Sequence, residues 1–99
     1  MKIKHLKVFG VTVPVKEEKG LLAERGLAAY YHVEKKYIAI DPSIKGEERD
    51  ATLLHELFHS MFFRLGFEQV RMSHDAHELL AENFSRILVE NFRITPKKA

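Results

Sequence analysis

The stretch His55-Glu56-Leu57-Phe58-His59 combines two metal-binding side chains with a carboxylate. Residues four apart lie on one face of a helix, so both imidazoles can reach a single ion. Two neutral histidine nitrogens suit zinc, and Glu56 would stand beside a zinc-activated water as its general base. The pattern therefore predicts a zinc-bound water with the carboxylate of Glu56 beside it. The alternative is a helix that carries two histidines without any chemical role.

A catalytic zinc site needs a third protein ligand and keeps a fourth position for water. Leu65 stands six residues after His59, where a metzincin would have a histidine, so that class is excluded. Glu78, in a later helical segment, is the expected third ligand. The small side chains of Ala81 and Ser85 would let its helix approach the histidine helix closely. Zinc is the expected metal, although sites of two histidines and a glutamate accept other divalent ions.

Three residues near Glu78 leave alternatives open for this assignment. Asp75 and Glu78 have the spacing of a helix cap, in which Asp75 would be the N-cap and Glu78 would reach back to it. Glu82 lies one turn after Glu78 and His74 lies one turn before it. Both share its helix face, so they are the substitute ligands.

Other polar residues are expected to support the site. His77 is expected to face solvent or to assist the ligands from outside the metal. Asp75 or Asp50 would orient a ligand histidine through its far ring nitrogen. A further donor should face the oxyanion that forms during hydrolysis. The candidates for that donor are Tyr31, Tyr37, His32 and His74.

The N-terminal half reads as strands. Residues 3–15 are rich in β-favouring side chains, with a bend or bulge expected at Gly10. Pro14 cannot donate a backbone hydrogen bond, so we expect this strand to lie at an edge or to end there. Residues 28–33 and 36–40 read as a hairpin. Residues 21–25 suit a short helical turn between the strands.

The C-terminal half reads as two helices, from about residue 47 to residue 65 and from about residue 74 to residue 92. The first is apolar nearly all round and is expected to be buried at the centre, with Gly66 closing it. The second has apolar side chains on one face, which are Ala76, Leu80, Phe84, Ile87 and Leu88. We therefore predict an α+β, zincin-like fold with a mainly antiparallel sheet of three or four strands packed on the two helices.

Composition limits the possible functions. The 99 residues predict one domain, in which 1–45 holds the strands and a connector, 46–92 the two-helix zinc-binding core and 93–99 a tail. The absence of cysteine excludes thiolate ligands and nucleophiles. A formal net charge of +2 predicts no nucleic acid or membrane partner. The charged N-terminus lacks the apolar run of a signal peptide, so we expect a cytoplasmic location.

Three segments resemble the ImmA/IrrE family of small intracellular peptidases, which are gluzincin-type metallopeptidases. The matching segments are Tyr37-Ile38-Ala39-Ile40 with residues 52–59, and residues 78–85. The resemblance implies a zinc peptidase with ligands His55, His59 and Glu78 and with Glu56 as the base. The chain departs from the family at Phe58, where glycine is frequent, and at Glu82, where asparagine is usual. It also lacks a helix-turn-helix that would bind DNA.

The function that follows is a zinc-dependent peptidase, expected to be an endopeptidase, that acts on a peptide or protein substrate. The family also includes regulators and toxins. One alternative is therefore a non-catalytic regulatory or interaction module in which zinc serves as a structural staple. Another is a toxin or phage factor that requires a regulatory protein partner to complete its cleft. Retention of Glu56 favours the enzyme, because a structural site needs no base.

Overall fold

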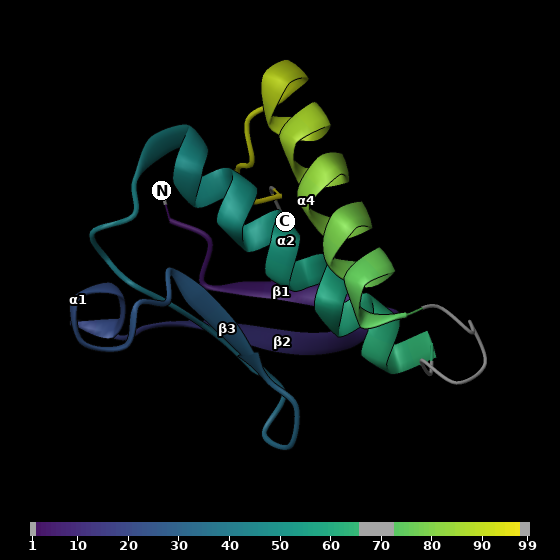
Figure 1. The fold of residues 1–99 in the computed structure, drawn as a ribbon, viewed down its shortest axis with the longest axis horizontal. Helices are drawn as coiled ribbons and strands as arrows, with labels where there is room; N and C mark the ends of the chain where they lie inside the picture. The colour runs from purple at the N-terminus through teal and green to yellow at the C-terminus, as the bar shows by residue number, and fades with distance from the viewer. Residues whose placement is uncertain (1, 66–72, 98–99) are drawn as a thin grey trace.

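Four short strands form a mixed sheet in the computed structural model, which describes residues 2–65 and 73–97 (Figure 1). The strands are β1 (His5–Val8), β2 (Val11–Glu17), β3 (Ala29–His32) and β4 (Tyr37–Ile40). Their order is β1-β2-β4-β3, with β2 and β4 parallel and the other two pairs antiparallel. The α+β prediction is confirmed, and β3 lies at one edge of the sheet.

The extended segment predicted over residues 3–15 is two strands, because the chain turns back at Phe9 and Gly10. Pro14 was expected to lie at an edge or to end the strand; β2 is an inner strand between β1 and β4, but its pairing with β1 does end at Pro14. Pro14 is opposite His5 of β1, whereas the pairing of β2 with β4 begins only at Val15. An inner strand therefore tolerates this proline, because it stands where one ladder ends and the other begins.

The predicted hairpin is confirmed as β3 and β4, and the turn at residues 21–25 forms the short helix α1 (Leu21–Arg25). Asp41 follows β4 directly and fixes the next turn. Its carboxylate accepts the backbone N–H groups of Leu22 and Ser43, each at 2.8 Å. The end of β4, the start of α1 and the connector to the next helix are thereby held together.

Helix α2 (Gly46–Leu65) lies across one face of the sheet, as Figure 1 shows. Alternate strand residues and one residue of α2 form the core, as expected from the two-residue period of a strand. The buried members are Val8, Val13, Ile38, Ile40 and Leu53. α2 is not buried all round, because Phe63 near its C-terminus is 41% exposed. A sheet covers one side of α2 and a single helix covers another, so part of its apolar surface remains in solvent.

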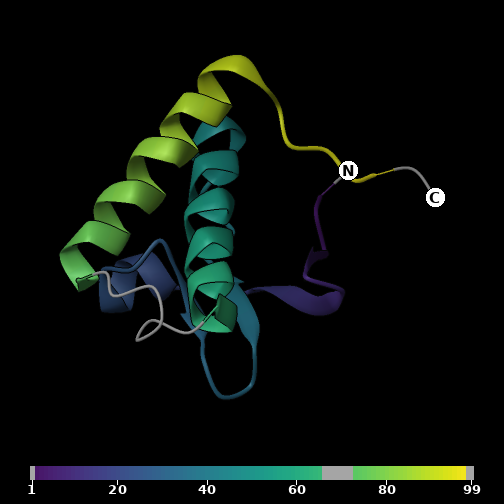
Figure 2. The same cartoon turned by 90° about the vertical axis from the view of Figure 1, so that its right-hand side faces the viewer.

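Helix α4 (His74–Asn91) packs against α2 (Figure 2). The face of α4 that is buried carries His77, Ala81, Ser85 and Val89, whereas Phe84 and Ile87 are exposed. The contact face is therefore not the apolar face read from the sequence. Ala81 and Ser85 are almost fully buried, which confirms that small side chains lie where the two helices meet.

Two further points concern the ends of the helices. Ser73 is the N-cap of α4 and its hydroxyl accepts the N–H of Ala76 at 3.1 Å, so the alternative in which Asp75 is the cap is wrong. The predicted helix end at Gly66 lies outside the described residues. Within the described ranges, neither α2 nor α4 is apolar enough over a sufficient length to cross a membrane.

Candidate metal centre

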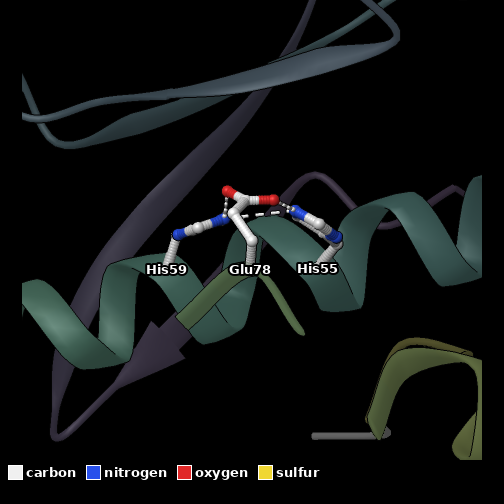
Figure 3. A group of neighbouring side chains, drawn as sticks. All are labelled: His55, His59 and Glu78. Carbon is white, nitrogen blue, oxygen red and sulfur yellow. Dashed lines mark hydrogen bonds and ion pairs between the residues drawn. The ribbon is translucent and has the colours of Figure 1, made fainter. Parts of the chain in front are cut away.

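His55 and His59 on α2 and Glu78 on α4 meet at one point (Figure 3). Four residues of helix bring the two imidazoles onto the same face, and their Nε2 atoms are 3.1 Å apart. Glu78 faces both rings, with Oε1 at 2.7 Å from Nε2 of His59 and Oε2 at 3.2 Å from Nε2 of His55. The three residues expected to bind the metal are thus brought together.

The spacing of these three residues suits a small divalent ion. One donor atom from each lies within 4.8 Å of the others, and the group can hold a metal. A tetrahedral zinc with bonds of about 2.0–2.1 Å would place neighbouring donor atoms about 3.3 Å apart. The contacts of 2.7–3.2 Å among the three side chains are close to that value. The three side chains would need to move apart only slightly to admit the ion.

The charges around the group also suit metal binding. Burial lowers the pKa of His59, an effect that the carboxylate of Glu78 opposes. A neutral imidazole offers a lone pair to a metal, whereas a protonated one does not. The low pKa of His59 therefore favours the ligating form near neutral pH.

Glu56 is buried beside the group but does not belong to it. Burial raises the pKa of its carboxyl to about 7; the charge on His55 acts against this shift and that on Glu78 adds to it. A carboxyl that exchanges a proton near neutral pH is suited to act as a general base and then as a general acid. This is the role that the sequence predicted for Glu56.

Glu82 does not replace Glu78 in the group, although the sequence left it open as a substitute ligand. Its Oε2 lies 3.1 Å from Nδ1 of His55, the ring nitrogen that does not face Glu78. Arg86 contacts Glu82 through Nε at 3.1 Å and reaches Glu48 on α2 at 2.7 Å. Glu82 therefore supports the outer side of His55, and Arg86 links α4 to the first turn of α2.

The sequence did not identify Arg86 or Glu48 as part of the site. The four-residue spacing of Glu82 and Arg86 on one helix was an available signal, because such pairs meet on a helix surface. The contact between Arg86 and Glu48 joins residues 38 apart in the chain. No local pattern predicts such a contact.

The other predicted supporting residues lie elsewhere. Asp50 accepts hydrogen bonds from Arg93 at 2.8 Å and from the backbone of Ile94 at 3.3 Å, so it holds the C-terminal segment and not a histidine. His77 is fully buried and packs on the ring of Phe62, 4.4 Å between centroids, so it does not face solvent. His74 is exposed at the start of α4 and its charge lowers the pKa of His59. Neither His74 nor Asp75 joins the group that can hold a metal.

Three of the four candidate oxyanion donors lie on the sheet, divided between its two faces, and the fourth, His74, lies on α4. Tyr31 faces α2, where its ring is 5.9 Å from that of Phe63. Successive side chains of a strand point to opposite faces, so His32 faces away from α2. Tyr37 is opposite His32 in the ladder and stacks on it at 5.0 Å. Tyr31 and His74 therefore remain as candidates, and Tyr37 and His32 do not.

A pocket of about 220 Å³ adjoins the group. Its walls come from the start of β3, from α2 and from α4, and are formed by Ala28, Ala29, Ala51, Thr52, His55, Glu56, Glu82 and Arg86. Glu56 and Ala29, which lies at the edge of the sheet, therefore line the same pocket. A ligand that enters between β3 and α2 would therefore pass beside both Glu56 and His55.

Comparison of the chain with protein-family models, with curated proteins and with solved structures found no match.

Proposed function

We propose that this protein is a zinc-dependent metallopeptidase of the gluzincin type, whose motifs resemble those of the ImmA/IrrE family. The observation that carries the proposal is the convergence of His55, His59 and Glu78, with donor atoms within 4.8 Å, beside the buried carboxyl of Glu56. Two histidines and one glutamate are the ligands of known catalytic zinc sites that keep an open position. A base next to such a site is what hydrolysis requires.

His55, His59 and Glu78 would hold the ion. When bound, zinc would supply a Lewis acid that activates water and polarises the scissile carbonyl. Glu56 would accept a proton from the attacking water and then give it to the leaving amine. Its pKa of about 7 suits both steps, because neither protonation state is strongly favoured at neutral pH. Tyr31 or His74 would donate to the oxyanion.

The edge strand β3 offers a way to position a peptide substrate. β3 pairs with β4 on one side and forms the edge of the sheet on the other. An extended peptide can add to such an edge through main-chain hydrogen bonds. Ala29 of β3 and Glu56 of α2 line the same pocket, so a peptide on this edge would carry its backbone past the base.

The alternative is a structural zinc site without catalysis. Structural zinc sites usually have four protein ligands, whereas catalytic sites keep one position open. Within the described ranges, the group has three members, and Glu82 contacts the outer nitrogen of His55. Three protein ligands, rather than four, support the catalytic site over the structural one. The partner-dependent toxin or phage factor would share the same zinc site and differ in needing a second chain.

The test combines metal content with cleavage. Zinc per chain is measured by mass spectrometry of the metal, and cleavage of a mixed peptide library is measured by mass spectrometry of the products. We expect the wild type to carry one zinc and to cleave, Glu56→Gln to keep zinc without cleaving, and Glu78→Ala to lose both. Glu90→Gln, an exposed change on the same helix, should behave as wild type. A wild type that holds zinc but cleaves nothing would favour the structural site.

A further inference from the structure

A second pocket, of about 350 Å³, lies further along the same edge strand. Its walls are formed by two turns of the sheet, the end of β3 and the last described turn of α2, with the residues Phe9, Tyr31, Val33, Lys36, Phe63 and Arg64. Phe63 follows His59 by four residues, which is about 6 Å along a helix. Tyr31 follows Ala29, which lines the first pocket, by two residues of strand. The two pockets therefore adjoin one path along β3.

The lining of this second pocket is apolar with a cationic rim. Phe9 is 66% exposed, Val33 47% and Phe63 41%, so three large apolar side chains are gathered at one solvent-accessible place. Lys36 and Arg64 supply positive charge, and none of the described residues that line the pocket is acidic. The first pocket, in contrast, carries Glu56 and Glu82. An exposed apolar cluster of this kind commonly marks an interaction site.

The backbone at two of these residues adopts a conformation that their side chains disfavour. Phe9 has φ +50° and Lys36 has φ +56°, and in the described part of the chain no other non-glycine residue has a positive φ. Phe9 and Gly10 are consecutive at positive φ, a turn in which asparagine or aspartate is the usual first residue. The side chain of Phe9 is mostly exposed, so its burial offsets little of the cost of this backbone conformation. Strain of this kind is concentrated at functional sites.

We propose that this pocket selects the substrate by binding a large apolar or aromatic side chain that has a carboxylate beside it. The inference rests on the proposed peptidase function. The aromatic walls would bury the apolar side chain, and Lys36 and Arg64 would attract the neighbouring carboxylate. Because a strand advances about 3.3 Å per residue, the selected side chain would lie about two residues from the bond that is cleaved.

The test separates recognition from cleavage. Zinc-loaded Glu56→Gln protein is used to select binders from a library of random decapeptides, and the wild type is assayed for cleavage of the same library. We expect the selected and the cleaved peptides to be enriched in a large apolar residue next to Asp or Glu. Phe9→Asn should weaken binding of the selected peptides about tenfold, through the lost apolar contact, while raising thermal stability, because asparagine suits the turn.

Reversing the charges at the rim of the pocket is the second part of the test, and it has its own control. Lys36→Glu together with Arg64→Glu should change the preference from acidic to basic neighbours, with zinc content unchanged. Lys35→Glu makes the same reversal as Lys36→Glu alone, in the same turn, but does not line the pocket, so the preference should remain.

Each possible result has a distinct meaning. Selected peptides with the expected pattern would support the pocket even if the wild type cleaved none of them, and only the proposed function would then fail. Cleavage without any preference, or a preference that Phe9→Asn and the charge reversal leave unchanged, would overturn the pocket and leave the peptidase intact. Failure to select any peptide, with a dimer that Phe9→Asn dissociates, would assign the pocket to a second copy and overturn the inference.

Discussion

Glu82 lies 3.1 Å from Nδ1 of His55, while Nε2 of the same ring lies 3.2 Å from Glu78. In the tautomer that donates from Nδ1 to Glu82, Nε2 offers its lone pair toward Glu78 and His59. A carboxylate in this position fixes the tautomer and the orientation of the ring. Arg86, which also contacts Glu48 on α2, holds Glu82 in turn, so the orientation of His55 depends on both helices.

Removing this carboxylate should weaken metal binding without removing a ligand. We expect Glu82→Ala to bind zinc about 10- to 100-fold less tightly than wild type, as is typical when such a supporting group is lost. The affinity is measured by competition with a chromophoric chelator. Glu82→Gln keeps an acceptor oxygen and should lose less zinc affinity than Glu82→Ala. Glu90→Ala should keep the zinc affinity of the wild type. Equal zinc affinities for Glu82→Ala and wild type would show that His55 needs no such support.

Metal binding should also stabilise the fold, because the ligands come from two helices that must be packed to meet. A ligand that binds only the folded state, at a free concentration one hundred times its dissociation constant, adds about 2.7 kcal/mol to the free energy of unfolding. We therefore expect zinc to raise the urea midpoint of the wild type and a chelator to reverse the effect. His59→Ala should show neither change. A zinc effect of the same size in His59→Ala would place the stabilising ion elsewhere.

The parts that local patterns determine were predictable from the sequence. The spacing of His55 and His59 places them on one helix face, and the apolar runs on either side predict that helix. The hairpin of β3 and β4 follows from β-favouring residues on either side of a short turn. Glu78 was predicted because a third ligand was required and the later helix offered it beside the small residue Ala81.

The parts that depend on long-range packing were not predictable. The parallel pairing of β2 with β4 joins Val15 to Ile38, and no pattern within either strand specifies that partner. The sequence also did not predict how α4 is rotated about its axis. The apolar residues Phe84 and Ile87 are exposed, whereas Ser85 is buried. The rotation follows from the close approach of the helices at Ala81 and Ser85, which is a tertiary effect.

The contact between α2 and α4 predicts the effect of a larger side chain. Ala81 is fully buried where the helices meet, one turn from Glu78. Ala81→Leu would force α4 away from α2, and overpacking of this kind typically costs about 1–3 kcal/mol. Zinc affinity should fall as well, because Glu78 would move away from the histidines. Both are measured on the same protein, by urea unfolding and by chelator competition.

The control for Ala81→Leu is Asn83→Leu, which adds an apolar side chain at an exposed position of the same helix. We expect it to leave zinc affinity unchanged. A loss of stability in Ala81→Leu with full zinc affinity would mean that the helices can separate without displacing Glu78.

Asp41 should make stability dependent on pH in the acidic range. Hydrogen bonds from the backbone N–H of Leu22, first, and then from Ser43 lower the pKa of its carboxyl below the ordinary value of 3.8. A carboxyl with a lowered pKa in the folded state stabilises the fold at pH values above its unfolded pKa, and this contribution is lost as the pH falls through the folded pKa. The stabilisation is therefore present at neutral pH and disappears below about pH 4.

Asp41→Asn tests this dependence. Asparagine keeps one acceptor oxygen but turns an NH₂ group toward the other backbone donor, so we expect a melting temperature several degrees lower at neutral pH. The difference between wild type and variant should shrink as the pH falls below about 4, because the wild type then loses the same charge. Thermal unfolding over a pH series measures this difference, with the exposed change Glu34→Gln as control. A difference that stays constant with pH would mean that the packing of residue 41, and not its charge, holds β4 to α1.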